Sequence, residues 1–193
     1  MLVENLDADK YTTEEYSVTP KRAGLMSLAV LVPYYVICVV IYLTQRNYAN
    51  IFATIFKATF LLELFLLAIG IFVVICIALI LKAAALSIFS GNKANNLKFK
   101  IIKEAQKPHC FLSEPIKIWE YRICLIIYIF FSALLPYIIS LILGDFMFVL
   151  VSFIPAYWAG NDIWLLIKLF GKKGGDYVID FDSVMLYRIY KRK

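Results

Sequence analysis

Residues 51–89 read IFATIFKATFLLELFLLAIGIFVVICIALILKAAALSIF and decide the fold class, because they form the longest apolar run of the chain. At about 1.5 Å per residue a helix of this length would extend roughly 58 Å, whereas the hydrocarbon core of a bilayer is roughly 30 Å thick. The run therefore predicts a membrane helix that either projects from the bilayer or contains a break. Lys57 and Lys82 stand near its two ends, where lysines extend to lipid headgroups, and Glu63 is the only charge between them.

Three further apolar runs lie at residues 24–43, 123–143 and 146–170, and the last two are joined by Gly144-Asp145. Of the whole chain, 62% is hydrophobic, whereas soluble domains are nearer one half apolar. The sequence thus predicts an all-α membrane protein with four transmembrane helices. The connection at Gly144-Asp145 is too short for anything but an antiparallel return of the fourth helix.

Basic residues are distributed unevenly over the connections between these runs. Residues 93–122 hold seven Lys or Arg and residues 168–193 hold seven more, whereas the other two connections hold Arg46 alone and Asp145 alone. Cytoplasmic loops of membrane proteins carry such an excess of positive charge. We therefore expect an integral protein of a bacterial inner membrane with both termini in the cytosol. The same distribution explains the net charge of +6 without a nucleic-acid partner.

The regions outside the spans suggest a simple domain organisation. Residues 1–22 are polar and acid-rich without a cleavable signal peptide, and we expect a flexible N-terminal tail. A transmembrane domain then occupies residues 23–170 and includes a cytosolic loop at 90–122. Residues 171–193 form a β-like C-terminal tail.

A small cytosolic β-sheet is expected from the central loop and the C-terminal tail. Residues 97–101 alternate apolar and basic side chains, which is typical of a half-buried strand. Residues 177–180 and 185–190 also resemble short strands, which can pair with each other and with the first strand. Pro108 and Pro115 bracket a segment that we expect to be irregular.

Several short passages in the second half follow one another in a fixed order. They are Leu97-Lys98-Phe99-Lys100-Ile101, Pro108-His109-Cys110, Glu114-Pro115-Ile116, Tyr121-Arg122, Ala159-Gly160-Asn161-Asp162, Val178-Ile179-Asp180 and Tyr187-Arg188-Ile189-Tyr190. In residue type, order and spacing they resemble a bacterial domain-of-unknown-function family of membrane proteins described as site-2-protease-like zincin peptidases. The resemblance covers about residues 78–193. It implies a membrane-embedded helix bundle and, in the family, an H-E-x-x-H zinc motif on a membrane helix.

This chain lacks the zinc-binding residues that the resemblance implies. Counted back without a gap from Lys98-Phe99, the motif falls on Ala78-Leu79-Ile80-Leu81-Lys82, and another register gives Leu62-Glu63-Leu64-Phe65-Leu66. Neither contains histidine, and the only histidine of the chain is His109. Zinc hydrolysis needs about three protein ligands and an open position for water. We therefore expect no catalytic residues, no metal and no other cofactor, and we take Ala78, Leu79 and Lys82 as degenerate motif positions.

Lys82 and Asp162 lie at similar distances from the expected cytosolic ends of their helices. Lys82 precedes its helix end by about 7 residues and Asp162 by about 8, or roughly 11 and 12 Å at 1.5 Å per residue. One possibility is that the Lys82 ammonium replaces the metal and pairs with Asp162, which also corresponds to the family's acid on the last helix. The other, more common outcome is that Lys82 extends to the lipid headgroups. Glu63 is a second intramembrane acid, which either serves a function or faces water and Lys57.

The histidine and the four cysteines have ordinary explanations. His109-Cys110 would be half of a metal site, but the sequence contains no second pair such as C-x-x-C, so a structural role in the loop is preferred. Cys110 is expected in the reducing cytosol, and Cys38, Cys76 and Cys124 lie within apolar runs. No disulfide framework is indicated.

The leading functional hypothesis is a catalytically inactive relative of a membrane-embedded zincin peptidase. It would bind another membrane segment or a client protein in the groove that its enzymatic relatives use for substrate. A small oligomeric transporter or channel that uses Glu63 and Asp162 is an alternative, as is a membrane scaffold without a groove. An active metalloprotease with atypical ligands is the least favoured alternative. The expected partners are the lipid bilayer and either a membrane protein client or further copies of the chain.

Overall fold

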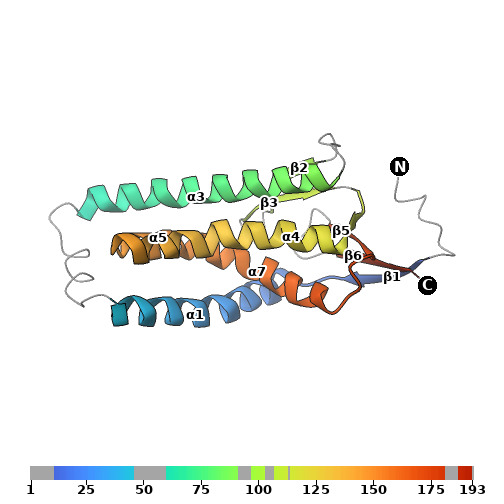
Figure 1. Cartoon of the computed structure of the whole chain (residues 1–193), viewed down its shortest axis with the longest axis horizontal. Coiled ribbons are helices and arrows are strands. Elements are labelled where there is room, and N and C mark those ends of the chain that lie inside the picture. The colour runs from blue at the N-terminus through green and yellow to red at the C-terminus, as the bar shows by residue number, and fades with distance from the viewer. Residues whose placement is uncertain are drawn as a thin grey trace.

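The computed structural model describes residues 11–45, 60–90, 97–102, 107–112, 114–180 and 187–192. Most of these residues are helical, and three helical segments are long and apolar enough to cross a membrane. Figure 1 shows α1, α3 and the α4–α5 segment side by side along the long axis, with the strands gathered at one end. We call this end of the bundle the sheet end. The three segments are Lys21–Gln45, Leu64–Phe89 and Ile118–Leu143.

The longest apolar run forms helix α3 (Phe60–Phe89), which is about 45 Å long at 1.5 Å per residue. It contains no proline and continues without interruption through Gly70. Many of its large apolar side chains are exposed, among them Phe65, Phe72 and Ile80. A break nearer the start of the apolar run would lie in residues 51–59, which are outside the described residues. Lys57 also lies there, and the side chain of Glu63 is outside the described side chains although its backbone belongs to α3.

The third span is one helical rod that contains a single π-helical turn. It consists of α4 (Ile118–Ile129), the π-helix η3 (Phe130–Leu134) and α5 (Leu135–Leu143). Pro136 has no N–H group and its ring clashes with the carbonyl four residues earlier in a regular α-helix. The wider π-turn directly before it relieves that clash, so the proline is accommodated without ending the helix. The hydroxyl of Tyr34, on α1 (Pro20–Gln45), donates to the Ala133 carbonyl in this turn at 2.8 Å.

A tight turn follows α5, as the glycine predicts. Gly144 adopts a left-handed conformation with φ of 71°, which suits glycine at a helix C-terminus. Its carbonyl accepts a hydrogen bond of 2.8 Å from Tyr42 on α1. The Asp145 carboxylate accepts one of 2.9 Å from the N–H of Met147, the first residue of the next helix. The turn therefore fixes three helical segments at the end of the bundle opposite the strands.

The fourth expected span is not one uninterrupted helix. It is divided at Ser152 into α6 (Met147–Val151) and α7 (Phe153–Phe170). The described helices include three that are long and apolar enough to cross a membrane, and α7, which contains Asn161, Asp162 and Lys168, is not among them. The expectation of four transmembrane helices is therefore confirmed for three helices and not for the fourth.

Helices α1 and α7 approach closely at one glycine. A Cβ atom at Gly160 would lie 2.8 Å from the Ser27 Cα and 3.0 Å from its carbonyl oxygen, so only hydrogen fits there. The Trp164 indole N–H on α7 donates to the Met26 carbonyl at 3.1 Å. The contact between these two helices therefore depends on a residue without a side chain.

The expected sheet is present, but it is larger and differently composed. Strands β5 (Tyr177–Asp180) and β6 (Tyr187–Arg192) pair antiparallel, in the order β1-β6-β5-β4, with Val178 opposite Ile189. The short β4 (Ile116–Lys117) forms one edge. The other edge is β1 (Tyr11–Tyr16), which lies within the region expected to be a flexible tail and pairs along its length with β6.

The 97–101 segment is a strand, but it does not join the other described strands as expected. Strand β2 (Leu97–Ile102) pairs antiparallel with β3 (Lys107–Leu112) in a separate two-stranded sheet. The expectation of an irregular segment from Pro108 onward was therefore wrong. Both strands of a two-stranded sheet have an open edge, so a proline is tolerated when its missing N–H belongs to that edge.

The main apolar core lies between the helices and both sheets at the sheet end. It joins side chains from α3, α4 and α7 to strands β3, β4, β5 and β6. Fully buried members include Leu86, Cys110, Ile118, Leu125, Leu169, Val178 and Ile189.

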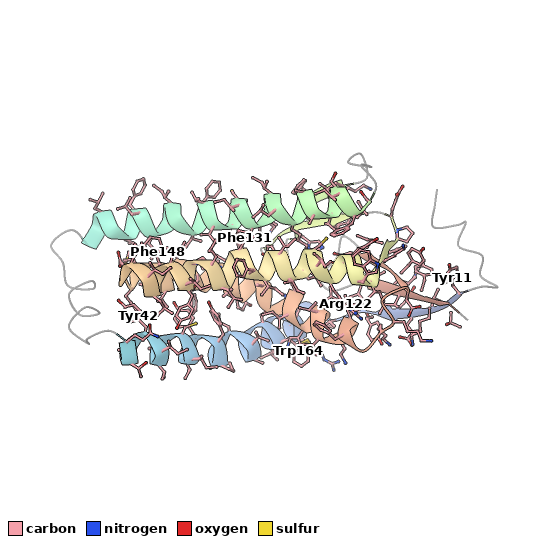
Figure 2. All side chains as sticks on the ribbon, viewed as in Figure 1. Tyr11, Tyr42, Arg122, Phe131, Phe148 and Trp164 are labelled. Atoms are coloured by element: carbon pink, nitrogen blue, oxygen red, sulfur yellow. The ribbon has the colours of Figure 1, made fainter. Side chains whose placement is uncertain are left out.

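Arg122 of α4 connects this core to the end of α7. Its guanidinium donates to the carbonyls of Leu169 and Lys172, the latter at 2.6 Å. A cation at the C-terminus of a helix satisfies unpaired carbonyls and interacts favourably with the helix dipole. Figure 2 shows Arg122 near the sheet end and Tyr42 toward the opposite end of the bundle.

Candidate functional site

A buried polar cluster lies where α3, α4 and α7 meet the strands. Lys82 of α3 and Asp162 of α7 are 1% and 3% exposed, and the Lys82 Nζ lies 3.5 Å from Asp162 Oδ1. The same ammonium stands 5.2 Å from the centre of the Tyr128 ring on α4, within the range of a cation–π contact. The Lys82 side chain is therefore directed into the bundle, and the alternative in which it extends to the headgroups does not fit its burial.

The neighbouring residues on α3 share the orientation of Lys82. Ala78, one helical turn earlier, is fully buried and packs in one cluster with Tyr128 and Ala159 of α7. Residues four apart lie on one face of a helix, so positions 78 and 82 both face α4 and α7. Leu79 is partly buried beside the same cluster. These are the positions that the gap-free register assigns to the degenerate zinc motif.

A second polar group lies beside this pair and connects the two sheets. Asp180, at the end of β5, is 8% exposed and accepts a short hydrogen bond from the Tyr121 hydroxyl of α4. The His109 Nε2 on β3 lies 3.1 Å from Asp180 Oδ2, although the two are not aligned as a hydrogen bond. The contact is therefore electrostatic, and it becomes an ion pair when the imidazole is protonated. The His109 ring also stacks on Phe111.

The electric field of the cluster couples Asp180 to Lys82. Burial raises the pKa of Asp180, but the nearby His109, the Lys82 ammonium and the Tyr121 hydroxyl favour the carboxylate, so its pKa lies below the ordinary 3.8. Lys82 thus serves two carboxylates, Asp162 by contact and Asp180 at longer range. One ammonium against two carboxylates leaves a deficit of one positive charge among these three groups.

The thiol of Cys110 is not activated by this cluster. Burial raises its pKa to about 11, and the opposing effect of the Lys82 ammonium is too small to reverse the shift. The thiolate is the reactive form of cysteine, so a thiol with such a pKa is a poor nucleophile and a poor metal ligand at neutral pH. Cys110 is fully buried and acts as an apolar core residue.

The donor set does not suit a metal ion. Among the described residues no group of three or more His, Cys, Asp and Glu side chains is placed to hold one. A zinc ion would have to share the space between Asp162 and the aromatic ring of Tyr128 with the Lys82 ammonium, and two cations there would repel each other. What the arrangement does chemically is to hold charge: it buries two carboxylates, Asp162 in contact with the Lys82 ammonium and Asp180 at longer range from it.

The sequence brought Lys82 and Asp162 together but did not identify Asp180 or Tyr121 as their neighbours. Both belong to passages that carry the resemblance, but the sequence predicts no role for either of them. One signal was present: Asp180 is an acid at the end of the apolar strand YVID, where a buried carboxylate requires a partner. Glu63 stays a prediction, because its side chain lies outside those described.

Two further buried polar atoms have no hydrogen-bond partner among the described residues near the α1–α7 crossing. They are the hydroxyl oxygen of Ser27 and the side-chain carbonyl oxygen of Asn161, next to Asp162 in the chain.

Comparisons of the chain with models of protein families, with curated proteins and with solved structures each found no match.

Proposed function

We propose that this chain is a non-catalytic membrane protein of four crossings that binds the membrane segment of another protein. The observation that carries the non-catalytic part is the buried contact between Lys82 and Asp162. In a membrane zincin peptidase a divalent cation neutralises the inward-facing acid. Here Lys82, on the face of α3 that is turned toward α7, neutralises Asp162. The lysine cannot activate a water molecule as a Lewis acid, so the charge remains and the hydrolytic chemistry is lost.

The strand pairing supports a fourth crossing by α6 and α7. Strand β1 leads into α1, and β6 follows α7, yet β1 and β6 are hydrogen-bonded neighbours and must lie on one side of the membrane. An even number of crossings must therefore separate them. Three are supplied by α1, α3 and the α4–α5 rod, so residues 147–170 supply the fourth. Their 24 residues extend roughly 36 Å as helix, enough for a bilayer core of about 30 Å.

The position of α7 inside the bundle explains how it crosses with Asp162. This acid is costly in lipid but is buried against Lys82, so it does not contact the hydrocarbon. The basic residues of the sheet end, among them Lys172, Lys173 and Arg188, support a cytosolic position for that end by the positive-inside rule.

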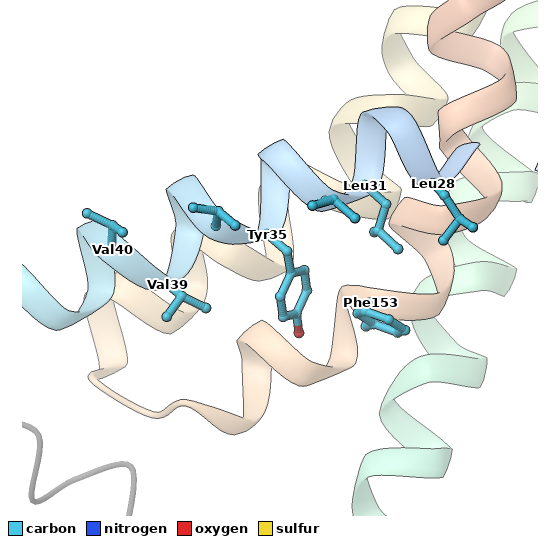
Figure 3. A pocket seen from close by; sticks show the side chains of 8 residues that line it. Leu28, Leu31, Tyr35, Val39, Val40 and Phe153 are labelled. Atoms are coloured by element: carbon cyan, nitrogen blue, oxygen red, sulfur yellow. The ribbon is translucent and has the colours of Figure 1, made fainter. Parts of the chain in front are cut away.

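The surface of α1 supports the binding of another helix. Leu28, Val32, Val36 and Val40 recur every fourth residue and are all exposed, which makes one apolar ridge along the helix. A second row, Leu31, Tyr35 and Val39, lies beside it, and Phe153 of α7 lines the same groove, with its ring centre 5.0 Å from that of Tyr35. Figure 3 shows these side chains around a cavity of about 410 Å³ that they line.

The chemistry of this groove favours an apolar helix as its occupant. All of its lining side chains are apolar except Tyr35, and the Tyr35 hydroxyl is already donated to the Val149 carbonyl at 2.9 Å. Valines lose little rotamer freedom when they pack, which favours contact with another rigid helix. Small gaps between rows spaced by four residues accept the side-chain ridges of a partner helix.

Photo-crosslinking in membranes tests client binding. A benzoylphenylalanine in place of Val36, which is 57% exposed, should form adducts with a membrane protein of the host. The matched control is Phe72, which is 67% exposed on α3 and outside the groove, and should form adducts with lipid alone. Equal patterns at both positions, or lipid adducts alone at Val36, would contradict the proposal.

Restoration of a zinc site tests the relation to zincin peptidases separately. In the variant Ala78→His/Lys82→His, two imidazoles on one helix face would meet Asp162 and supply three ligands for zinc. We expect the purified variant to bind about one equivalent of zinc, and the same variant with Asp162→Asn to bind it more weakly. A folded double-histidine variant that takes up no zinc would refute this assignment of positions 78 and 82.

The transporter alternative gains no support from the described residues. An ion path through Asp162 requires a carboxylate that can exchange its counter-charge, whereas Asp162 is already paired with a buried ammonium of the same chain.

A further inference from the structure

The β2–β3 hairpin has two chemically different faces. Side chains alternate along a strand, so Leu97, Phe99 and Ile101 share one face of β2 and Lys98 and Lys100 share the other. The register places Phe99 opposite Cys110 and Leu97 opposite Leu112. Directly opposite residues in an antiparallel pair lie on the same face, so the first face continues onto β3.

The apolar face of the hairpin is turned toward the ends of the membrane helices. Cys110, Leu112 and Leu97 pack in the main core with Ala83 and Leu86 of α3. Beyond this contact the same face of the hairpin is exposed. Phe99 and Ile101 are 62% and 67% exposed, although Cys110, opposite Phe99, is fully buried. Two large apolar side chains are thus displayed on the hairpin that packs against the end of α3.

The opposite face of β2 carries positive charge. Lys98 and Lys100 are both exposed, and the register places them across from Phe111 and His109 of β3. A strand with apolar side chains toward the bilayer and lysines on the other face has the same amphipathic arrangement as an interfacial helix. Lysines close to the surface of a cytosolic leaflet are attracted to its anionic lipids, which create a negative surface potential.

We propose that the β2–β3 hairpin is an interfacial anchor that inserts Phe99 and Ile101 at the boundary of headgroups and acyl chains and binds anionic lipid through Lys98 and Lys100. This inference rests on the proposed function only for the position of the sheet end at a membrane surface. It does not depend on client binding by α1. The occupant of the apolar face is the bilayer, because this face continues the apolar surface of the bundle and the lysines on the other face of β2 complement anionic headgroups.

Tryptophan fluorescence of a Phe99→Trp variant in nanodiscs tests the anchor. The spectrum of the parent protein is subtracted, which removes the three native tryptophans. Brominated phosphatidylcholine in the nanodisc should quench the new signal, and aqueous iodide should not. Brominated phosphatidylglycerol at the same mole fraction should quench more strongly, because each lysine enriches anionic lipid by about fivefold. In Phe99→Trp with Lys98→Gln and Lys100→Gln, the two lipids should quench equally.

The controls separate the faces and the possible occupants. An Ile101→Trp variant should repeat the result for Phe99→Trp, whereas a tryptophan on the other face, Lys98→Trp, should be quenched less by brominated lipid. Quenching of Phe99→Trp by iodide would show that the face is in water and overturn the proposal. Protection from both quenchers would show that protein covers the face, and equal quenching by both lipids with the lysines present would remove the anionic preference. Either result overturns the proposal.

Failure here is distinguishable from failure of the proposed function. The fluorescence test reports on β2 in nanodiscs without any partner, whereas the crosslinking test reports on α1 in the host membrane.

Discussion

Replacement of Lys82 by methionine is the most direct test of the buried cluster, because methionine retains an apolar unbranched stem but lacks the ammonium. Asp162 then loses a partner at 3.5 Å, and Tyr128 loses a cation at 5.2 Å. Removal of one member of a buried ion pair typically costs about 3–5 kcal/mol, since the other charge stays buried without compensation. We expect a cost in the upper half of that range, because Asp180 also loses the favourable field of Lys82.

The assay is the free energy of unfolding in nanodiscs, followed by intrinsic fluorescence as denaturant is added. Lys117→Met is the matched control, because Lys117 is exposed at the start of α4 and its removal should change the free energy by no more than about 0.5 kcal/mol. The same measurement on parent protein gives the reference.

A double-mutant cycle then isolates the contact itself. Asp162→Asn alone should also destabilise, because it strands the Lys82 ammonium. The double variant Lys82→Met/Asp162→Asn should cost less than the sum of the two, with a coupling energy of roughly 1–3 kcal/mol. Part of the cost should remain in the double variant, because Asp180 still lacks its distant cation. A Lys82→Met protein within about 1 kcal/mol of the parent, together with additive single costs, would refute the account of the cluster.

Three further predictions concern other parts of the structure. Gly160→Ala should destabilise the protein by about 1–3 kcal/mol in the same unfolding assay, because the new Cβ would meet the Ser27 backbone. Gly175→Ala is the control and should be tolerated, because the space around Gly175 is open. Similar costs for both variants would contradict the close contact between α1 and α7. Because the pKa of Asp180 is lowered on folding, its stabilising contribution should be present above pH 3.8 and lost as the pH falls through the lower folded value. When the free energy of unfolding is measured as the pH is lowered, it should therefore fall less in Asp180→Asn than in the parent protein. Cys110, buried and with a pKa raised to about 11, should resist maleimide at pH 8 in the folded protein and react after denaturation, as judged by peptide mapping; rapid labelling of folded protein would show that the site opens.

The helices could be predicted from the sequence because each long apolar run has few ways to satisfy its backbone in lipid. Residues 60–89 and 118–143 are helical where the runs indicated, and Gly144 ends its helix as expected. The similar depths of Lys82 and Asp162 could be predicted from the helix rise alone, because α3 and α7 both end at the sheet end and each residue was counted back from the end of its helix. Neither count required knowledge of tertiary contacts.

The strands were harder to predict because their partners are distant in sequence. The segment 11–16, YTTEEY, has no apolar alternation, and its pairing depends on β6 and on the contacts of Glu14 with Lys172 and Lys191. These lysines hold the pKa of Glu14 at about 2, which shows how strongly the acid is engaged. Asp180 was missed for the same reason: its neighbours His109 and Tyr121 come from a hairpin and a helix far along the chain.

The pairing of β1 with β6 also has a consequence for biogenesis, because the two strands are synthesised at different times. Glu14 emerges from the ribosome long before Lys191, which lies 177 residues later, and the chain is made from its N-terminus. During this interval β1 has no partner strand while the later helices are still being made. The β1–β6 ladder can close only if α7 ends on the side of the membrane where β1 lies. Strand pairing therefore depends on correct insertion of every helix between the two strands, because a misinserted helix would leave β1 and β6 on opposite sides of the membrane, each with an unpaired edge.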